Sequence, residues 1–307
     1  MEVHKVKSPK KPLLRLEQKR GLVGWAFLFV AAALIVVMNF YPMVRGFMLA
    51  LQTGVGARMG YADPLWLNFA RLFEDPWFRQ TVINTFQYLL IQVPIMLILA
   101  LILASMLNHR DLKFRGFFRT AIFLPCAVGL VAYSLVFRQM FANNGLINIL
   151  LIDMGLINEG IIWLNSDPRY AKFVIIIGLL WRWTGFNMIF YLAGLQNIDR
   201  SIYEAARIDG ASVFQQFWRI TVPLLRPIIL LTAIMSTNGT LQLFDESMNL
   251  TGGGPGVTGT RTMSHHIFNT VFEGSPQLGY ASAMSFTILI FVAVLALIQI
   301  KVADIRD

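Results

Sequence analysis

The chain has 307 residues, of which 56% are hydrophobic and only 14% are charged, and its formal net charge is +9. A soluble domain carries charge on about a quarter of its residues, so this composition excludes an ordinary water-soluble globule and indicates a membrane protein. The positive charge then reflects the placement of lysine and arginine relative to a bilayer, and not affinity for nucleic acid. A single cysteine, Cys126, excludes an internal disulfide.

Six segments are apolar enough and long enough to cross a bilayer, which takes about 20 helical residues. They are residues 22–43, 82–107, 117–137, 172–195, 224–245 and 280–302. Their apolar runs are continuous and do not alternate with polar residues, so they predict helices and not the strands of a barrel. We therefore expect an all-α, polytopic membrane protein with six transmembrane helices.

The N-terminal residues 1–21 are basic and precede the first apolar run, as in a signal peptide. The run at 22–43 is longer than the apolar part of a signal peptide, and no clear cleavage site follows it. We therefore expect a basic tail at 1–21, which acts as a solvated topogenic signal, and a retained anchor at 22–43. A specific lipid site in the tail is the alternative.

Lysine and arginine are distributed unequally between the two sides of the predicted helices. Seven lie in the tail, four in the loop at 110–119, four in the segment at 196–226 and two at the C-terminus, against eight in the opposite loops. The positive-inside rule therefore places both termini and the segment 196–226 in the cytoplasm.

The segment 196–226 is a polar stretch with regular helix signals. Ser201 with Glu204, and Ser212 with Gln215, have the spacing of capping boxes. They predict two short helices, at 202–208 and 213–220, separated by a turn at Gly210. Pro223 and Pro227 then redirect the chain into the fifth span.

The first of these helices carries small residues beside charged ones. Ala205, Ala206 and Gly210 allow another backbone to approach closely, and Glu204 and Asp209 supply charge around them. A simple connection between helices takes only about 2–8 residues. The pattern predicts a docking surface for another protein, and an amphipathic segment resting on lipid is the alternative.

The run from Glu204 to Ala211, with Phe217, Ile220, Pro223 and Pro227, resembles the EAA loop of permeases in binding-protein-dependent ABC importers. Five further motifs resemble the carbohydrate-uptake branch, the maltose and multiple-sugar type: Trp181 to Met188, Ala193 to Ile198, Phe244-Asp245, Thr251 to Pro255 and Gly279 to Ala283. Asn84-Thr85 and Phe123 to Pro125 also sit where that family has them. Asp199-Arg200 departs from the family, which commonly has a proline at or beside these positions. The large periplasmic insertion of the best-known maltose permease is also absent from this sequence.

The resemblance implies a type I ABC importer permease fold with both termini in the cytoplasm and a family domain at about 80–302. In that family the coupling loop, here about 196–226, docks in a cleft of the ATPase subunit. By match, Glu204, Ala205, Ala206, Asp209 and Gly210 make that contact. The implied partners are a second permease in a heterodimer, two ATP-binding subunits, an extracellular solute-binding protein and the lipid bilayer. The implied location is the bacterial cytoplasmic membrane.

Polar residues inside the predicted spans are candidates for a solute path, because such residues usually face a cavity or the bundle interior. In the second span they are Thr81, Asn84, Thr85, Tyr88 and Gln92. In the fourth and fifth spans the candidates for substrate contact are Trp183, Phe186, Asn187, Ser236, Asn238, Gly239, Thr240 and Gln242. Aromatic rings that stack on sugars, with amides and hydroxyls around them, suit a carbohydrate. Packing between helices is the alternative role for each residue.

Arg182 lies deep in the fourth span and needs a partner, for which Asp245 or Glu246 is available. Binding of an anionic substrate is the alternative role. The glycine run at 251–256 lacks the ending of a phosphate loop and predicts an external turn. His265-His266 lacks the spacing of a metal site and is interpreted as a solvated pair.

No catalytic constellation, metal motif or ATP-binding motif is visible, so we expect no enzyme and no cofactor in this chain, with ATP-Mg bound by the partner ATPase. The sequence thus favours a permease subunit for a sugar or oligosaccharide. The alternatives are a permease for another solute, such as a glycerophosphate or polyamine, and a secondary transporter, which would show repeats or carboxylates within the spans. A membrane enzyme would need an acidic, histidine or cysteine cluster.

Overall fold

The computed structural model describes residues 16–55, 58–109 and 112–303, and the chain divides into two compact units between Leu49 and Ala50. The first unit contains α1 (Leu16–Ile35), a π-helical turn η1 (Val36–Phe40) and all but the last residue of α2 (Tyr41–Ala50). Residues Val23–Ala50 are long and apolar enough to cross a membrane. This helix includes the expected anchor at 22–43 and continues seven residues beyond it. Most of the expected basic tail lies outside the described residues.

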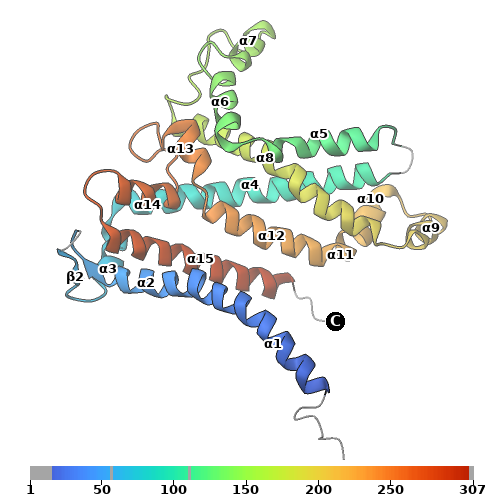
Figure 1. Ribbon diagram of the computed structural model, residues 1–307. Helices are drawn as coiled ribbons and strands as arrows, with labels where there is room; N and C mark the ends of the chain where they lie inside the picture. Colours follow the sequence, from blue (N-terminus) through green and yellow to red (C-terminus); the bar gives the residue numbers. More distant parts are fainter. Residues whose placement is uncertain (1–15, 56–57, 110–111, 304–307) are drawn as a thin grey trace, which may run out of the picture. The chain divides into compact units, whose positions relative to one another are not determined.

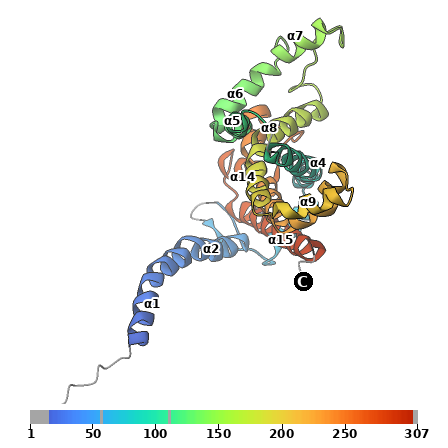
Figure 2. The ribbon, with the colours of Figure 1, turned by 90° about the vertical axis from the view of Figure 1, so that its right-hand side faces the viewer.

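Four long helices form the framework of the second unit (Figures 1 and 2): α4 (Pro76–Asn108), α8 (Pro168–Gln196), α12 (Arg226–Leu241) and α15 (Leu278–Ala303). Helix α4 packs against α8 and α12, and α12 packs against α15. Their buried faces form three apolar clusters, and their outward faces keep many apolar side chains exposed. Apolar residues on both sides of a helix are typical of a bundle that faces lipid.

Two of these helices begin at the same sequence signal, an aspartate followed by a proline. The carboxylate of Asp75 accepts hydrogen bonds from the backbone N–H groups of Trp77 and Phe78, and that of Asp167 accepts one from Arg169 N–H. Proline fits the first helical turn because its missing N–H has no partner there in any helix. These caps start α4 and α8 several residues before the expected starts at 82 and 172.

The expected continuous helix at 117–137 is wrong, because this segment is broken. Helix α5 (Arg115–Ala127) and helix α6 (Leu130–Met140) meet at 97°. Val128 and Gly129 between them have extended backbone angles. Pro125 in the last turn of α5 cannot donate a hydrogen bond, which weakens the helix at this point. Helix α7 (Leu146–Asp153) follows α6.

The chain also bends at the start of the fifth expected span, where Pro223 and Pro227 predict a change of direction. Helix α10 (Val213–Gln216), the π-turn η3 (Phe217–Thr221) and α11 (Val222–Leu224) precede α12 and meet it at 70°. Helix α12 ends at Leu241 and not at 245, and α13 (Asp245–Thr251) is separate. Within the described residues, four helices are long and apolar enough to cross a membrane, or up to six if each bent pair is one span.

The two ends of the second unit differ in structure (Figure 1). At one end lies α9 (Arg200–Ile208) with α10. At the other end lie α3 (Leu67–Glu74), α14 (Met263–Phe272) and a hairpin of two-residue strands, β1 (Gln52–Thr53) and β2 (Gly60–Tyr61). The strands pair antiparallel, with Gln52 opposite Tyr61. The helices α4, α8, α12 and α15 therefore connect two polar ends.

Glycines on α8 bring this helix into close contact with the broken segment. A Cβ atom on Gly185 would collide with the backbone carbonyl of Ile122 in α5, and one on Gly178 would collide with the Tyr133 hydroxyl in α6. Small residues allow such close approach between helices in a membrane. Both arms of the broken segment are therefore packed on one face of α8.

Candidate solute cavity and coupling surface

A cavity of about 340 Å³ lies between α4, α6, α8, α12 and α13. Its volume falls within the range of about 300–1,000 Å³ that is usual for ligand pockets. It brings together seven of the eight residues predicted for the solute path: Trp183, Phe186, Asn187, Ser236, Gly239, Thr240 and Gln242. Asn238 does not line it and lies with Gln242 on a second cavity of about 410 Å³, beside α14 and α15. Whether these residues contact solute stays a prediction.

The polar groups of the cavity are linked to one another. Ser236 Oγ donates to Asn187 Oδ1 at 3.4 Å, and Thr240 Oγ1 donates to Gln92 Oε1 at 3.2 Å. The rings of Trp183 and Phe186 meet edge to face, with centroids 5.9 Å apart. The cavity therefore presents aromatic surface beside amides and hydroxyls, a combination suited to a polyhydroxylated solute.

Two carboxylates that the sequence interpretation did not assign to the path, Asp245 and Glu246, also line the cavity. Glu246 is only 3% exposed. Burial raises the pKa of Glu246 to about 7, and the nearby charge on Asp245 acts in the same direction. The sequence carries a signal for them, because Asp245 and Glu246 lie at the end of the fifth expected span, after its polar residues. The sequence interpretation uses Glu246 only as a partner for Arg182, and Asp245 also as part of a family motif.

Arg182 does not pair with either carboxylate within the described residues. Its Nη1 donates to the backbone carbonyl of Val128 at 2.7 Å, at the break between α5 and α6. The expected ion pair with Asp245 or Glu246 is therefore wrong. A backbone carbonyl left free by a broken helix can accept a hydrogen bond from a guanidinium, although it does not neutralise the positive charge as a carboxylate would.

The polar face predicted along the second span serves mainly to hold the loop at residues 258–261. Asn84 Nδ2 donates to the carbonyls of Thr258, at 2.6 Å, and Arg261, at 3.0 Å. Tyr88 Oη donates to Thr260 O at 3.2 Å. Of the five residues proposed for this face, only Gln92 lines the 340 Å³ cavity. The assignment of the others to the path is therefore not supported, because their polar groups bind protein backbone.

The glycine run at 251–256 is fixed by the same loop. Helix α13 ends at Gly252, whose φ of +60° favours glycine. Thr260 then donates from N to Gly253 O at 3.1 Å and from Oγ1 to Gly254 O at 2.7 Å. The run is therefore a turn with defined internal partners, and no feature of it resembles a phosphate loop.

The interpretation of His265-His266 as a solvated pair is wrong, since their exposed fractions are only 1% and 9%. His265 Nδ1 lies 2.8 Å from Ser247 Oγ, which connects α14 to α13. Both side chains point inward because α14 places them on its buried face. Within the described residues no group of three His, Cys, Asp or Glu side chains could hold a metal ion.

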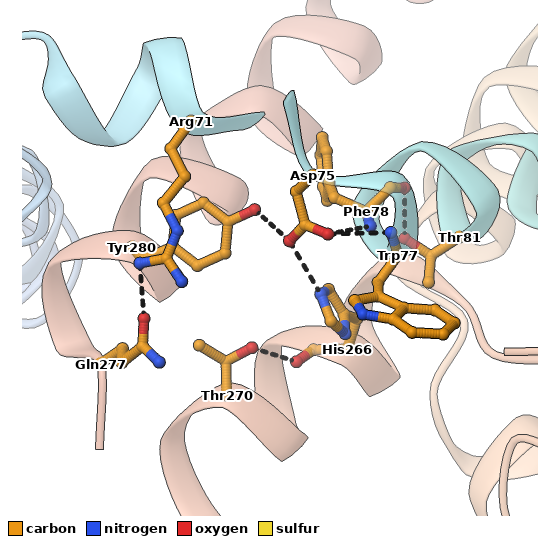
Figure 3. A network of polar contacts seen from close by, with 9 residues as sticks. All are labelled: Arg71, Asp75, Trp77, Phe78, Thr81, His266, Thr270, Gln277 and Tyr280. Carbon is orange, nitrogen blue, oxygen red and sulfur yellow. Dashed lines mark hydrogen bonds and ion pairs between the residues drawn. The ribbon is translucent and has the colours of Figure 1, made fainter. Parts of the chain in front are cut away.

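His266 belongs to a polar cluster between α3, α4, α14 and α15 (Figure 3). The Tyr280 hydroxyl donates to Asp75 Oδ2 at 2.6 Å, and His266 Nε2 lies 3.8 Å from the same oxygen. Arg71 lies over the Tyr280 ring and donates to Gln277 Oε1 at 2.6 Å. The cluster joins four elements at the end of the bundle opposite α9.

Burial by itself would raise the pKa of Asp75, but hydrogen bonding outweighs it. The bonds from Tyr280 and from the backbone N–H groups of Trp77 and Phe78, with the charge on His266, leave that pKa below its usual value. Asp75 therefore stabilises the fold above its unfolded pKa of 3.8 and loses that effect as the pH falls through its lower folded value.

Histidine protonation should weaken this end of the molecule at a higher pH. Burial, with the charges of Arg261 and His266, lowers the pKa of His265 from 6.5 to about 4, and the pKa of His266 is also lowered. The unfolded chain then binds more protons, so stability falls as the pH drops from about 6.5 to about 4. We expect the melting temperature in detergent to fall over this interval and His265→Gln to reduce the slope. An equal slope in the variant would contradict this account.

The candidate coupling surface lies at the opposite end, on α9 and the turn after it. The side chain of Asp199, and not of Ser201, caps α9, because its carboxylate accepts from Ser201 N–H at 2.9 Å. The expected Ser201–Glu204 capping box is therefore wrong, whereas the Ser212–Gln215 box is present at α10. Gly210 has a φ of +80°, as expected for the residue that ends this helix.

The five residues predicted for docking lie together on this surface. Glu204, Ala205, Asp209 and Gly210 are exposed, and Ala206 is partly buried. Large apolar side chains beside them are also exposed: Ile208 at 87%, Val213 at 82% and Phe214 at 72%. Contiguous exposed apolar side chains next to polar ones are typical of an interaction site. The contact with an ATPase stays a prediction.

The long apolar helices, around a cavity lined by both apolar and polar side chains, define a multi-pass membrane protein. The chain matches the family described as "Binding-protein-dependent transport system inner membrane component" over residues 69–303. It is 50% identical to the lactose transport system permease protein LacF of Rhizobium radiobacter, covering 92% of this chain and 94% of that protein. It is 30% identical to the arabinooligosaccharides transport system permease protein AraP of Halalkalibacterium halodurans, covering 98% and 93%.

The fold is also similar to a chain in a solved structure, the bacterial alginate ABC transporter in complex with its alginate pentasaccharide-bound periplasmic protein. The TM-score is 0.75, the sequence identity is 24%, and 94% of each chain is covered. The chain therefore belongs to the family of inner-membrane permeases of binding-protein-dependent transport systems. It is accordingly a multi-pass protein of the cytoplasmic membrane.

Proposed function

We propose that this chain is one of two permease subunits of an ABC importer and that it forms half of the path for a sugar or oligosaccharide. The observation that carries the proposal is the cavity of about 340 Å³, in which Trp183 and Phe186 lie beside amide and hydroxyl groups. Two transport proteins to which the chain is similar in sequence are named for sugars, lactose and arabinooligosaccharides.

In this proposal the chain crosses the membrane six times, with each bent helix pair counted as one span and both termini in the cytoplasm. Residues 1–21 are the cytoplasmic tail, 22–43 lie in the first span, 80–302 form the importer domain and about 196–226 form the coupling loop. The unequal distribution of lysine and arginine supports this orientation. The separation of α9 from α3 and α14, at opposite ends of the long helices, agrees with a cytoplasmic and an external end (Figure 1).

The partners in this proposal are a second permease, two ATP-binding subunits that bind ATP-Mg, and an extracellular binding protein. The exposed apolar side chains around Gly210 support docking of an ATPase subunit on α9. The similar alginate transporter was solved in complex with a periplasmic protein. Coupling then requires that the two states of the ATPase dimer favour different positions of α9.

The carboxylates of Asp245 and Glu246 bear on the type of solute. Carboxylates accept hydrogen bonds from sugar hydroxyls, and an ionised carboxylate repels an anion at a cost of about 3 kcal/mol for two charges roughly 5 Å apart at an effective dielectric constant of about 20. With a pKa of about 7, Glu246 is only partly ionised near neutral pH. This observation favours an uncharged saccharide over a glycerophosphate. It also supports a cationic solute, such as a polyamine, as the second candidate.

Uptake by the reconstituted complex tests the role of the cavity. Phe186→Ala removes an aromatic wall and should lower uptake of a neutral disaccharide by about tenfold, because a buried aromatic contact contributes about 1.5 kcal/mol. Phe173→Ala, on the same helix at a 49% exposed position, is the matched control and should leave uptake unchanged. Equal uptake by both variants would show that Phe186 is only a packing residue. Uptake of a polyamine, with no uptake of the disaccharide, would support the second candidate.

A further inference from the structure

Arg182 in the middle of α8 lines neither the cavity nor the candidate coupling surface, although its charge acts on Glu246 in the cavity wall. It is only 6% exposed, and it is not among the residues that line the cavity. A charged side chain at this depth in a membrane helix is costly unless it is paired, and intramembrane charges commonly have a functional role. Its Nη1 donates a hydrogen bond to the backbone carbonyl of Val128, at 2.7 Å.

The Val128 carbonyl lies at the break between α5 and α6. The backbone hydrogen bonds of α6 begin with Tyr133 N–H donating to Gly129 O, so the Val128 carbonyl lies outside the ladder of that helix. A carbonyl without a partner in apolar surroundings costs free energy. The guanidinium of Arg182 supplies the missing donor from a neighbouring helix.

Arg182 is also held between aromatic rings of both helices. Its guanidinium carbon lies 5.4 Å from the ring centroid of Tyr133 on α6 and 5.4 Å from that of Trp183 on α8. A cation within about 6 Å of an aromatic face is attracted to it. One side chain thus contacts the break, the first turn of α6 and its own helix.

This contact is adjacent to the cavity. Leu130, the first residue of α6, and Trp183, the neighbour of Arg182, both line it. We propose that Arg182 is a positioning residue, which holds the α5–α6 break and so sets the distance between the cavity walls that Leu130 and Trp183 supply. It acts on the solute through these walls and does not contact it. The functional part of this inference rests on the proposed role of the cavity.

A distance measurement tests the geometric part independently of any solute. Cys126 is the only cysteine and is replaced by serine. Spin labels are then placed at Phe117→Cys on α5 and Val136→Cys on α6, which are 69% and 56% exposed. Double electron–electron resonance on the assembled transporter should give a narrow distance distribution. Arg182→Met should broaden it, and Arg182→Lys, which keeps one charged donor, should restore most of the narrow distribution.

The second readout is the amount of solute transported per ATP hydrolysed, which a simple loss of folded protein would not change. In Arg182→Met we expect this ratio to fall by about fivefold or more, because the substitution leaves the buried carbonyl of Val128 without a donor. Arg182→Lys should recover part of the ratio. The matched control is Arg138→Met, an exposed arginine on α6, which should change neither readout.

An unchanged distance distribution in Arg182→Met would overturn the inference. Broadening with an unchanged transport ratio would overturn the link to the cavity and leave the break itself established. If Arg182→Met does not assemble, Arg182→Gln, which keeps an uncharged donor, is compared with Arg182→Lys in both measurements. If no sugar is transported by any variant, the proposed function fails, while the distance measurement still decides the role of Arg182 at the break.

Discussion

Replacing Gly210 with aspartate should lower ATP-driven uptake by at least about tenfold while the chain remains inserted in the membrane. Gly210 has a φ of +80°, in the left-handed region, where a residue with a Cβ costs about 1–2 kcal/mol. The substitution also adds a carboxylate beside Asp209. The turn after α9 would therefore shift, and its fit to an ATPase cleft would be lost. Uptake and ATP hydrolysis measured on the same proteoliposomes check this, since hydrolysis should continue without transport.

The matched control for this variant is Gly155→Asp. Gly155 also has a positive φ, of +67°, and an added Cβ atom would meet nothing within 4 Å at either glycine. It lies after α7, away from α9, so the same backbone strain and the same charge are introduced at another site. Equal loss of uptake in both variants, or normal uptake in Gly210→Asp, would count against α9 as the coupling element.

Replacing Gly185 with valine should prevent the second unit from folding correctly. The added Cβ atom would collide with the backbone carbonyl of Ile122, which cannot move aside as a side chain can. Overpacking of this kind costs about 3 kcal/mol, a large part of the stability of a typical domain. We expect a lower melting temperature and a reduced yield of monodisperse protein, measured by fluorescence-detected size-exclusion chromatography.

Gly116→Val is the control for this effect on stability. Gly116 is exposed on α5, and an added Cβ atom there would meet nothing within 4 Å. Valine should therefore be tolerated at 116, on the exposed face of α5, and not at 185, where α8 contacts α5. Similar melting temperatures for the two variants would mean that α5 and α8 are not closely packed.

The long helices and most of the cavity residues could be predicted from the sequence for physical reasons. A continuous apolar run of this length has few alternatives to a helix in a bilayer. A polar side chain in such a run must face other protein or water, which is why Asn187, Ser236 and Thr240 were found together in one cavity. The Ser212–Gln215 box and the turn at Gly210 depend only on local chemistry and were also predictable.

The features that could not be predicted from the sequence depend on contacts between residues far apart in the chain. Asn84 and Gln92 have the same polar character, but only the fold decides that Asn84 binds the loop at Thr258 and that Gln92 lines the cavity. The break at Val128–Gly129 was hidden by an unbroken apolar run, although Pro125 marked its position. Arg182 was predicted to pair with a carboxylate because a sequence does not reveal a free backbone carbonyl. The burial of His265 likewise follows from its position on α14 against α13.

The central claim is that this chain transports a saccharide as part of an ATP-driven complex, and uptake in proteoliposomes tests it most directly. The chain is reconstituted with its second permease, its ATPase subunits and its extracellular binding protein, and a labelled neutral saccharide is supplied outside, with ATP inside. The account predicts saccharide uptake that requires both ATP and the binding protein and that vanadate abolishes. Uptake that persists without the ATPase subunits or in the presence of vanadate would contradict it.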